Sequence, residues 1–465
     1  MVARLGDTSM PLTKAYMQLS DAALCWLETI LLERYGYPFV LKWDGDRIRM
    51  TLSGASGEIC FDTLQSVFSK PNSDFSCGFW DGTAENWQMA SEEFLPTPAV
   101  TEPPVPLIRK IDAGYVVHYD ILGLTYWMLS RQEEVGRTDL DKHGRFPAIA
   151  SNAYRNGYLG RPIVDEWLNL LGQVIQRQWP ALELKRHRFS MKVSHYVDVP
   201  SRYGFDGTYR LLRGMAGDLL KRRDWRNMYF RVTSRVNTRS RLYPADPVNS
   251  FNWIMDISEQ HELTSAFYFI SGRTNPRMDA TYEIEYPSIR RLMRDVHARG
   301  HEIGLHPSYN TYRNPVKIVA EADRLRRVCG EEGILQHEWG GRMHYLRWKH
   351  PVTLRGWEAA GMTYDSTLGY ADRPGFRCGT CFEYPAFDPV ECKALKLRIR
   401  PLVAMECSII GEHYMNSSLG QGARQEFLRL KAACRAVDGC FTLLWHNSQL
   451  CSAEKRKLYL DVLSQ

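Results

Sequence analysis

The run Gly300-His301-Glu302-Ile303-Gly304-Leu305-His306-Pro307-Ser308-Tyr309-Asn310 decides how the rest of the chain is interpreted. Residues 302–305 have the pattern of a short buried strand that is entered from Gly300. His306 follows where that strand ends and a loop begins. Parallel α/β folds build their sites at the carboxyl ends of strands, so this imidazole is a candidate metal ligand.

A metalloprotease helix is the competing interpretation of the same run. The H-E-x-x-H pattern needs its two histidines four residues apart, but His301 and His306 are five apart. Gly300 and Gly304 also disfavour a helix. We therefore predict a strand followed by a loop.

The bulk composition is that of an ordinary soluble globular protein. The chain has 465 residues, of which 24% are charged and 44% hydrophobic, enough for about two or three domains. Apolar runs such as 30–32 are too short to span a bilayer, and residues 1–11 lack the apolar core of a signal peptide. Eleven cysteines without a framework spacing suit reduced thiols. These features predict a cytoplasmic protein without a transmembrane segment.

The net charge of +6 is unevenly distributed. Between Arg210 and Arg241, ten Lys and Arg residues are opposed only by Asp218 and Asp224. Such a segment attracts the phosphates of a nucleotide sugar, a lipid-linked substrate or a membrane surface, although a solvated helix face fits equally well. Because no nucleic-acid-binding signature accompanies it, we expect no nucleic-acid partner.

The first 185 residues predict a smaller mixed α/β accessory domain without a recognisable site. The expected elements are a helix at 15–33, strands at 39–43, 47–52 and 58–61, an extended proline-rich connector at 95–107, and helices at 121–132 and 163–178.

Residues 186–465 alternate strands with helices, which predicts a second domain with a parallel sheet. Three of its predicted strands end at or just before Asp198, His306 and His446. Each of these three side chains can bind a metal ion, and each stands at the carboxyl end of a strand. A barrel with its site on the carboxyl face has this arrangement. We expect these side chains to converge on one pocket.

Five motifs follow one another in this part of the chain: 194–198, 300–306, 341–345, 364–370 and 443–446. In this order they resemble the motifs of the NodB-type polysaccharide deacetylases (carbohydrate esterase family four-like), over about residues 189–448. The resemblance implies a distorted (β/α) barrel that holds a divalent metal ion, with zinc expected, and removes acetyl groups from N-acetylated sugars. The upstream domain resembles the extra module found before such barrels in proteins linked to bacterial surface-polysaccharide gene sets.

The same resemblance implies roles for individual residues. Asp198 and His306 would be metal ligands, and Asn310 stands where the family usually has a second histidine. An amide oxygen is a weaker ligand for zinc than an imidazole. His446 would be the general acid that protonates the departing amine. Arg342 would orient the base or pair with a carboxylate such as Asp365.

Three further residues are candidate substrate contacts. Tyr345 and Trp445 offer aromatic faces to a sugar, and Arg377 offers a cation to a sugar phosphate. We expect His301 and His344, and likewise His337, to be structural or to support the ligands.

Tyr196 is the largest departure from the family, because the first motif has its general-base aspartate at this position. A phenol titrates near 10 and is mostly protonated at neutral pH. Three accounts stay open: a slow or inactive relative, an enzyme that uses Glu406 or Asp365 as its base, or an isolated substitution in a normal enzyme.

The resemblance thus implies a metal-dependent hydrolase that removes an N-acyl group from a sugar during surface-glycan assembly, and an impaired enzyme is one of the three accounts of Tyr196. The substrate would be an N-acetylated sugar, a nucleotide sugar, a lipid-linked sugar or an oligosaccharide. The alternative is a non-catalytic protein of the same fold that binds a glycan or a nucleotide sugar. A lipid-linked substrate would add peripheral membrane contact through residues 210–241.

Overall fold

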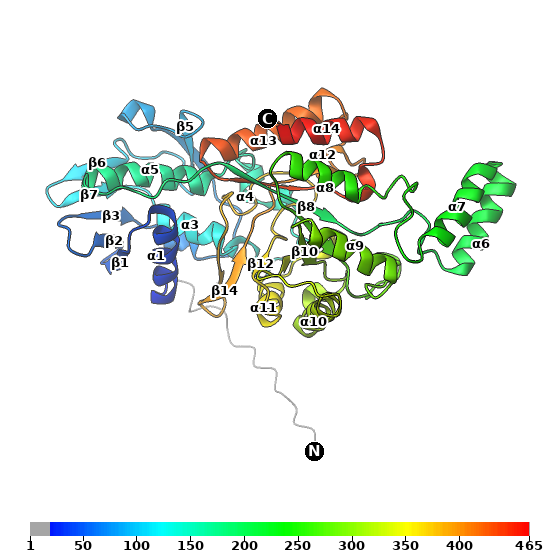
Figure 1. The fold of residues 1–465 in the computed structure, drawn as a ribbon. Coiled ribbons are helices and arrows are strands. Elements are labelled where there is room, and N and C mark those ends of the chain that lie inside the picture. The colour runs from blue at the N-terminus through cyan, green and yellow to red at the C-terminus, as the bar shows by residue number, and fades with distance from the viewer. Residues whose placement is uncertain (1–18, 465) are drawn as a thin grey trace, which may run out of the picture.

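Figure 1 shows the computed structural model of the chain, which describes residues 19–464 and arranges them around two main β-sheets. The smaller of the two lies in the N-terminal third and has the order β1-β2-β3-β7-β6. Its pairings are antiparallel except between β3 and β7. The strands are β1 (Phe39–Asp44), β2 (Arg47–Leu52), β3 (Glu58–Asp62), β6 (Ile108–Ile111) and β7 (Gly114–Val117).

Three of the five helices of this part lie close to those predicted, whereas the two four-residue helices were not predicted. The five helices are α1 (Asp21–Tyr35), α2 (Gln65–Phe68), α3 (Ile121–Leu129), α4 (Asn152–Arg155) and α5 (Ile163–Gln178). Helix α1 begins at Asp21 because the Ser20 hydroxyl accepts a hydrogen bond from the Ala23 amide at 3.2 Å, which caps the first turn. Residues 15–18 of the predicted helix lie outside the described residues.

The proline-rich connector predicted at 95–107 is only partly correct. Its first residues belong to β5 (Phe94–Pro98), which pairs antiparallel with β4 (Cys77–Asp81) in a two-stranded ribbon. Proline is tolerated at the edge of a sheet, where its missing N–H is not needed by a neighbouring strand. Pro96 and Pro98 therefore do not prevent the pairing.

The larger sheet has nine strands in the order β13-β14-β12-β11-β10-β9-β8-β16-β15. All neighbours pair in parallel except β13 and β14, which are antiparallel. The strands are β8 (Ser190–Tyr196), β9 (Ser265–Phe269), β10 (Glu302–Leu305), β11 (Gly340–Gly341), β12 (Tyr364–Asp365), β13 (Tyr384–Asp388), β14 (Lys393–Ile399), β15 (Ala404–Met405) and β16 (Cys440–Leu444).

The chain itself forces this sheet to curl. Strand β14 lies beside one edge of the sheet and β15 forms the other, yet only residues 400–403 separate them in sequence. A linker of that length spans at most about 18 Å. The two edges must therefore approach each other, although no ladder joins β14 to β15 among the described residues. The predicted barrel is thus observed as a curled parallel sheet that hydrogen bonds do not close.

Amphipathic helices cover the outside of the larger sheet (Figure 1). In α9, Leu292, Met293 and Val296 are buried, whereas Arg291 and Arg294 point outward. Proline at the first position of α9 and of α10 suits a helix start, because the N–H it lacks would be unpaired there. The helices are α8 (Phe251–Gln260), α9 (Pro287–Ala298), α10 (Pro315–Glu331), α11 (Val352–Ala359), α12 (Glu406–Ile410), α13 (Gln421–Ala436) and α14 (Ala453–Ser464).

Helix α1 of the N-terminal part packs against β13 and β14 of the larger sheet. The Trp26 indole donates a hydrogen bond to the Pro385 carbonyl at 2.9 Å, and its ring lies 5.1 Å from that of Phe387. The Arg398 guanidinium binds both carboxylate oxygens of Glu33, at 3.0 and 2.9 Å. The antiparallel edge of the larger sheet is therefore covered by α1 rather than left exposed.

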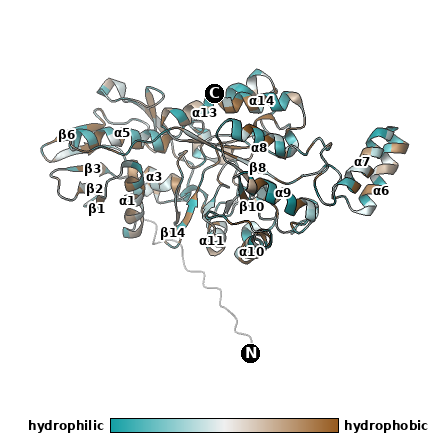
Figure 2. Cartoon of the chain, viewed as in Figure 1, coloured by the Kyte–Doolittle hydropathy of each residue, from teal (hydrophilic) through white to brown (hydrophobic). Residues whose placement is uncertain are grey.

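A helical hairpin projects away from the body of the molecule (Figure 1). It consists of α6 (Thr208–Gly217), a π-helical turn at Asp218–Arg222 and α7 (Trp225–Asn237), and we call it the helical arm. Helix α6 has no buried residue and α7 has one, Ser234. Figure 2 shows hydrophilic and hydrophobic residues mixed along both helices. Within residues 19–464, no helix is long and apolar enough to cross a membrane.

Candidate active site

The candidate residues follow three strands, β10, β8 and β16, that lie within a run of four in the larger sheet, with β9 between β10 and β8. Asp198 lies two residues after β8, His306 directly after β10, and His446 two residues after β16. The parallel registers pair Ser194 with Leu444, and Leu305 with Gly341 at the end of β11. Because parallel strands end at the same edge of a sheet, these side chains meet at one place.

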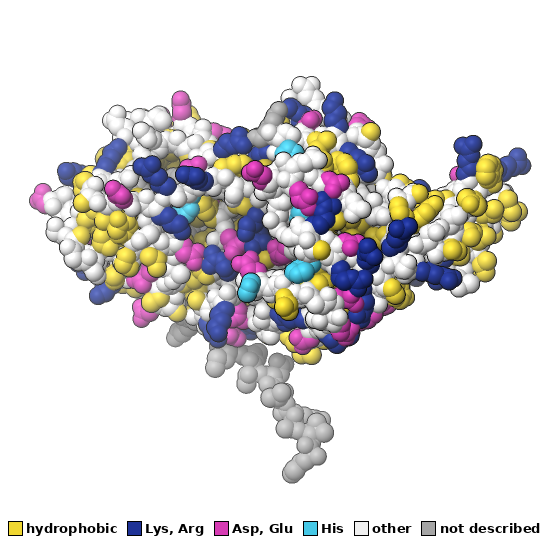
Figure 3. All heavy atoms as spheres, viewed as in Figure 1, with side chains coloured by type: hydrophobic (Ala, Val, Ile, Leu, Met, Phe, Trp, Pro, Cys, Tyr) yellow, Lys and Arg dark blue, Asp and Glu magenta, His cyan; other side chains and the backbone are white. Residues whose placement is uncertain are grey.

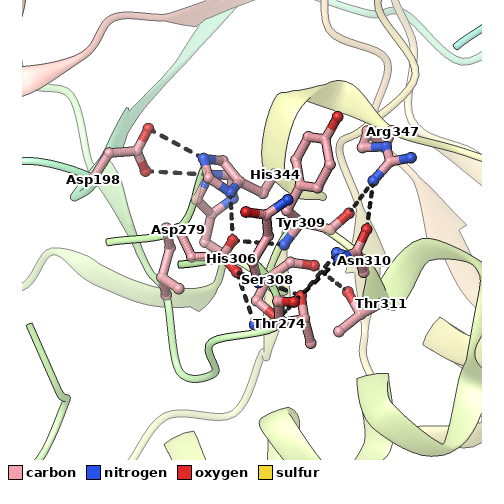
Figure 4. Close-up of polar contacts among 12 residues, drawn as sticks. Asp198, Thr274, Asp279, His306, Ser308, Tyr309, Asn310, Thr311, His344 and Arg347 are labelled. Atoms are coloured by element: carbon pink, nitrogen blue, oxygen red, sulfur yellow. Dashed lines mark hydrogen bonds and ion pairs between the residues drawn. The ribbon is translucent and has the colours of Figure 1, made fainter. Parts of the chain in front are cut away.

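Asp198, His306 and His344 form a compact group with the composition of a metal site (Figure 4). We call these three residues the metal group. The Nε2 atom of His306 lies 3.4 Å from Asp198 Oδ1, and that of His344 lies 3.8 Å from Asp198 Oδ2. Both imidazoles are buried, whereas the Asp198 side chain keeps 22% of its surface exposed. Donors about 2.0–2.2 Å from a tetrahedral zinc ion lie about 3.4 Å from one another, so the spacing suits a metal.

The hydrogen bonds behind the two imidazoles fix which nitrogen faces Asp198. His306 donates from Nδ1 to the Arg342 carbonyl at 2.5 Å, and His344 donates from Nδ1 to the Asp279 carboxylate at 3.1 Å. When such a ring is neutral, its Nε2 carries no hydrogen, and the lone pair of this nitrogen faces the lone pairs of the Asp198 carboxylate.

Two buried atoms of this group, His306 Nε2 and Asp198 Oδ1, have no hydrogen-bond partner. Burial lowers the pKa of His306, which keeps its ring neutral. Burial alone would raise the pKa of Asp198, but His306, His344 and His446 outweigh that effect and hold it well below its usual range. The two atoms are acceptors that face each other, and burying them without a partner is costly unless a cation lies between them. These residues therefore fit a divalent metal ion.

Asn310, predicted as the third ligand, does not lie in this group. Its amide donates to the Thr274 carbonyl at 3.1 Å, and its oxygen accepts from Arg347 at 3.2 Å. Figure 4 shows it on the far side of His306 from Asp198. A turn at Ser308 and a 3-10 turn over Thr311–Arg313 carry the chain away from the metal group after His306. The second histidine near Asp198 is His344, which we expected to be structural or supporting.

His446 and Glu406 form a hydrogen-bonded pair beside the metal group. Glu406 is fully buried at the start of α12, and its Oε1 accepts from both the Nδ1 and the backbone N–H of His446, at 2.5 and 3.1 Å. His446 Nε2 lies 3.8 Å from Asp198 Oδ2. Burial would lower the pKa of His446, but the Glu406 carboxylate outweighs it and raises that pKa. The pair therefore presents an imidazolium to the metal group, which is the protonation state of a general acid.

Tyr196, at the end of β8, is buried against both histidines. Its ring stacks on that of His306 with 3.9 Å between centroids, and it meets the His446 ring edge-on at 4.9 Å. The hydroxyl has no hydrogen-bond partner among the described residues, and burial raises the pKa of this phenol well above 10. At neutral pH Tyr196 is thus a neutral wall of the site rather than a base.

Arg342 and Asp365 are brought near each other in the sheet but are not paired. Arg342 is 1% exposed, and its guanidinium donates to the Ser366 carbonyl and to the hydroxyls of Ser366 and Ser194, at 2.7–2.8 Å. Asp365 accepts instead from the Thr367 amide at 2.8 Å, and burial raises its pKa to about 6. Arg342 also lies 5.6 Å from the Tyr196 ring, so it borders the position where the sequence resemblance implied a base, and it has no carboxylate there to orient.

A cavity of about 480 Å³ opens over the metal group. Tyr196, Asp198, His344, Tyr345 and His446 line it, together with residues 198–202 and 277–281. Neither Glu406 nor Asp365, the two alternative bases, is among the lining residues. Its carboxylates are Asp198, Asp206 and Asp279, and Asp279 is already engaged by His344.

Of the three predicted substrate contacts, the structure places one in this cavity. Tyr345 lines it with a φ of 62°, a strained backbone conformation for a tyrosine. Arg377 is buried elsewhere and binds both oxygens of Glu134, at 2.9 and 2.5 Å. Trp445 is fully buried and stacks on Phe427 at 5.5 Å. Both belong to the packing between elements.

Sequence reasoning missed the roles of His344 and Asp279. His344 lies three residues after β11, so the rule that strand ends converge would place it near the same edge of the sheet. Asp279 comes from the loop between β9 and α9, and nothing in its local sequence marks it.

Comparison with known proteins gives a family only for the N-terminal part. Residues 26–180 match a family of unknown function (DUF7033). This range contains the whole five-stranded sheet. A search of curated proteins gave no match. The family match covers about a third of the chain and does not reach the metal group.

Two solved structures are similar to the chain at 13% sequence identity. One is a Mycobacterium smegmatis protein provisionally described as a polysaccharide deacetylase, with a TM-score of 0.38 over 60% of this chain and 84% of that one. The other is Puue allantoinase, with a TM-score of 0.34 over 61% of this chain and 84% of that one. Both scores are too low to carry a conclusion about fold or function.

Proposed function

We propose that this chain is a metal-dependent hydrolase that removes an N-acyl group, with N-acetyl expected, from an amino sugar. The observation that carries the proposal is that the group of Asp198, His306 and His344 lies beside the His446–Glu406 pair, under one cavity. Asp198, His344 and His446 line that cavity. The motif resemblance supports the amino-sugar substrate class and a part in the assembly of a bacterial surface polysaccharide, and we propose the cytoplasm as the compartment.

The metal group supplies the electrophilic half of this chemistry. Asp198, His306 and His344 would hold the ion, and we expect zinc, which two imidazoles and a carboxylate commonly bind. Such an ion polarises an acyl carbonyl and lowers the pKa of a water molecule. The carbonyl of Arg342 and the carboxylate of Asp279 keep the two imidazoles in the tautomer that ligation requires.

His446 supplies the proton that amide cleavage needs. Its Nε2 faces the metal group, and Glu406 holds the opposite nitrogen and stabilises the imidazolium. When the C–N bond breaks, His446 donates this proton to the departing nitrogen, and the product leaves as a neutral amine. The neutral His446 is then reprotonated from solvent, which its raised pKa favours.

The proton of the attacking water has no dedicated acceptor at position 196. General-base assistance contributes about 10²–10⁴-fold, so we expect turnover to be slow by roughly this factor. The same observation favours a second candidate function, a non-catalytic protein of this fold that binds a glycan or a nucleotide sugar. The buried and unionised Tyr196 is the feature that supports it.

One experiment separates the two functions. The purified full-length chain is analysed for bound zinc, iron, manganese and cobalt, then stripped with a chelator and reloaded. Acetate release is measured on N-acetylated monosaccharides, nucleotide sugars and lipid-linked sugars. The hydrolase predicts release that disappears on stripping and returns on reloading. A metal-loaded protein that binds these sugars and releases no acetate from any of them supports the binding protein instead.

A further inference from the structure

The helical arm exposes an unusual amount of apolar surface. Eight of the twenty large hydrophobic side chains that are exposed among the described residues lie on it. On α7 they follow the spacing i, i+4, i+7 and i+11, which places them on one face of the helix. The eight are Tyr209, Leu212, Leu219, Leu220, Trp225, Tyr229, Val232 and Val236.

The arm holds its shape without covering this face. Asp218, fully buried at the turn, accepts from Arg231 at 2.5 Å, Arg222 at 2.6 Å and Asn227 at 3.0 Å. These hydrogen bonds hold α6 and α7 together through polar contacts. Leu220 and Trp225 remain 77% and 63% exposed at the tip. A surface helix is normally stabilised by burying its apolar stripe, so an external surface is needed to cover this one.

The charges around the apolar face indicate which kind of external surface would cover it. Arg213, Lys221, Arg223 and Arg226 are exposed, and among the described residues none of them has an acidic partner within 4 Å. Figure 3 shows hydrophobic side chains gathered on the arm with Lys and Arg side chains beside them. Apolar and aromatic residues flanked by cations are the pattern of helices that lie in the interface of an anionic bilayer.

A second copy of the chain is a poorer occupant of the same face. A two-fold dimer brings the same patch of both copies together. That arrangement would place the eight Lys and Arg residues of one arm, counted over 208–237, against the same eight of the other, with only two carboxylates on each. Like charges across an interface oppose association.

The arm is also continuous with the cavity of the candidate active site. Asp206 and Arg210, at its root, line the same cavity as Asp198 and His446. Arg202 and Arg277 line it too, and neither has an acidic partner within 4 Å among the described residues. Arg202 and Arg277, together with Arg210 whose guanidinium lies 3.8 Å from Asp206, give the cavity cations that suit the phosphate of a substrate.

We propose that the helical arm docks on an anionic membrane surface and presents the cavity to an amino sugar carried on a lipid phosphate. The second half rests on the proposed hydrolase function, whereas membrane docking stands on the arm alone. The substrate would sit with its lipid in the bilayer, its phosphate at Arg202, Arg210 and Arg277, and its N-acyl group at the metal group.

The test of docking uses full-length protein and vesicles of phosphatidylcholine with about one third phosphatidylglycerol. Co-sedimentation is compared for the parent, the tip variant L219E/L220E/W225E and the matched body variant V316E/L335E, which alters side chains 77% and 81% exposed outside the arm. We expect the tip variant to bind at least about tenfold more weakly and the body variant to bind like the parent. Raising salt from about 0.1 to about 0.5 M should weaken parental binding severalfold, since it screens the cations.

Three results would overturn the docking proposal: no binding of the parent to these vesicles, equal binding of the tip variant, or a parental dimer that the tip variant dissociates while neither binds vesicles. An Asp198→Asn variant, inactive if the hydrolase function holds, should bind vesicles like the parent, which separates failure of docking from failure of catalysis. For the substrate, acetate release from a lipid-linked amino sugar in vesicles should fall at least about tenfold in the tip variant and stay unchanged on a soluble N-acetylated sugar. Equal loss on both substrates would contradict the lipid-borne substrate.

Discussion

The two sides of the cavity differ in how many of their polar groups have hydrogen-bond partners. On the metal side, each imidazole has its rear nitrogen held by an acceptor and its front nitrogen directed at Asp198. On the side of Tyr196, a phenol stands unpartnered and Arg342 is bonded to serines. Under the proposed function, the ligand set for the metal is therefore complete, whereas position 196 offers no group that accepts a proton from water.

The largest effect is expected where the metal side is broken. His306→Ala removes one of the three proposed ligands, so we expect loss of the metal and a fall in turnover of about 10⁴-fold or more. Metal content and acetate release check this together. Asn310→Ala is the matched control and should keep its metal, because Asn310 bonds to Thr274 and Arg347 instead. Retention of the metal by a His344→Ala variant and its loss from the Asn310→Ala variant would reverse our choice of third ligand.

A smaller loss is expected when the acid pair is weakened and the metal is left in place. Glu406→Gln keeps the shape but removes the charge that stabilises the His446 imidazolium, so we expect turnover to fall by about 10²–10³-fold. The Glu406 carboxylate raises the pKa of His446 in the parent. Removing that charge should lower this pKa and so move the alkaline limb of the pH–rate profile to lower pH. An unchanged profile with full metal content would show that His446 is not the acid.

Restoring a carboxylate should make the two sides more alike. Tyr196→Asp places a base beside His306 and Arg342, and we expect turnover on N-acetylated sugars to rise at least about tenfold. Tyr196→Phe is the control, and it should change turnover by less than about twofold because the hydroxyl has no partner. An Asp variant that folds, holds metal and is no faster would refute the assignment of position 196 to the base.

The smallest effect on activity is expected from the support of the ligand loop. Glu321 accepts from the amide and hydroxyl of Ser308, two residues after His306, and burial raises its pKa to about 7. A raised pKa gives stability that is full below about 4.5 and is lost as pH rises through 7. Glu321→Gln lacks this loss, so its unfolding free energy relative to the parent should rise by up to about 3 kcal/mol from pH 5 to pH 8. Denaturation at the two pH values measures it, and a constant difference would contradict it.

Part of the site was predictable because a general rule places it. Asp198, His306 and His446 follow parallel strands, and such strand ends converge whatever lies between them. The choice between Asn310 and His344 was not predictable from spacing, since it depends on the turn after His306. Trp445 lies between Leu444 and His446, and alternation along an extended chain would have put it on the face opposite His446.

The fold was predictable to a similar extent. Strands β1, β2 and β3 and helix α5 were expected from their periodicity, which is a local signal. The open seam between β14 and β15 has no local signal, because it depends on which edges meet. The antiparallel strand β13 and the cover that α1 gives it depend on contacts about 360 residues apart in sequence, such as Trp26 to Pro385.

That cover has a consequence for how the protein can be divided. Without α1, the outer side of β13 would present unpaired backbone groups and the ring of Phe387 to solvent, which is a template for aggregation. Fragments that begin at residue 186 should therefore be insoluble, whereas the same fragments co-expressed with residues 1–185 should be recovered as a complex. Evolution faces the same restriction, and the two halves are expected to be inherited together rather than shuffled as independent modules.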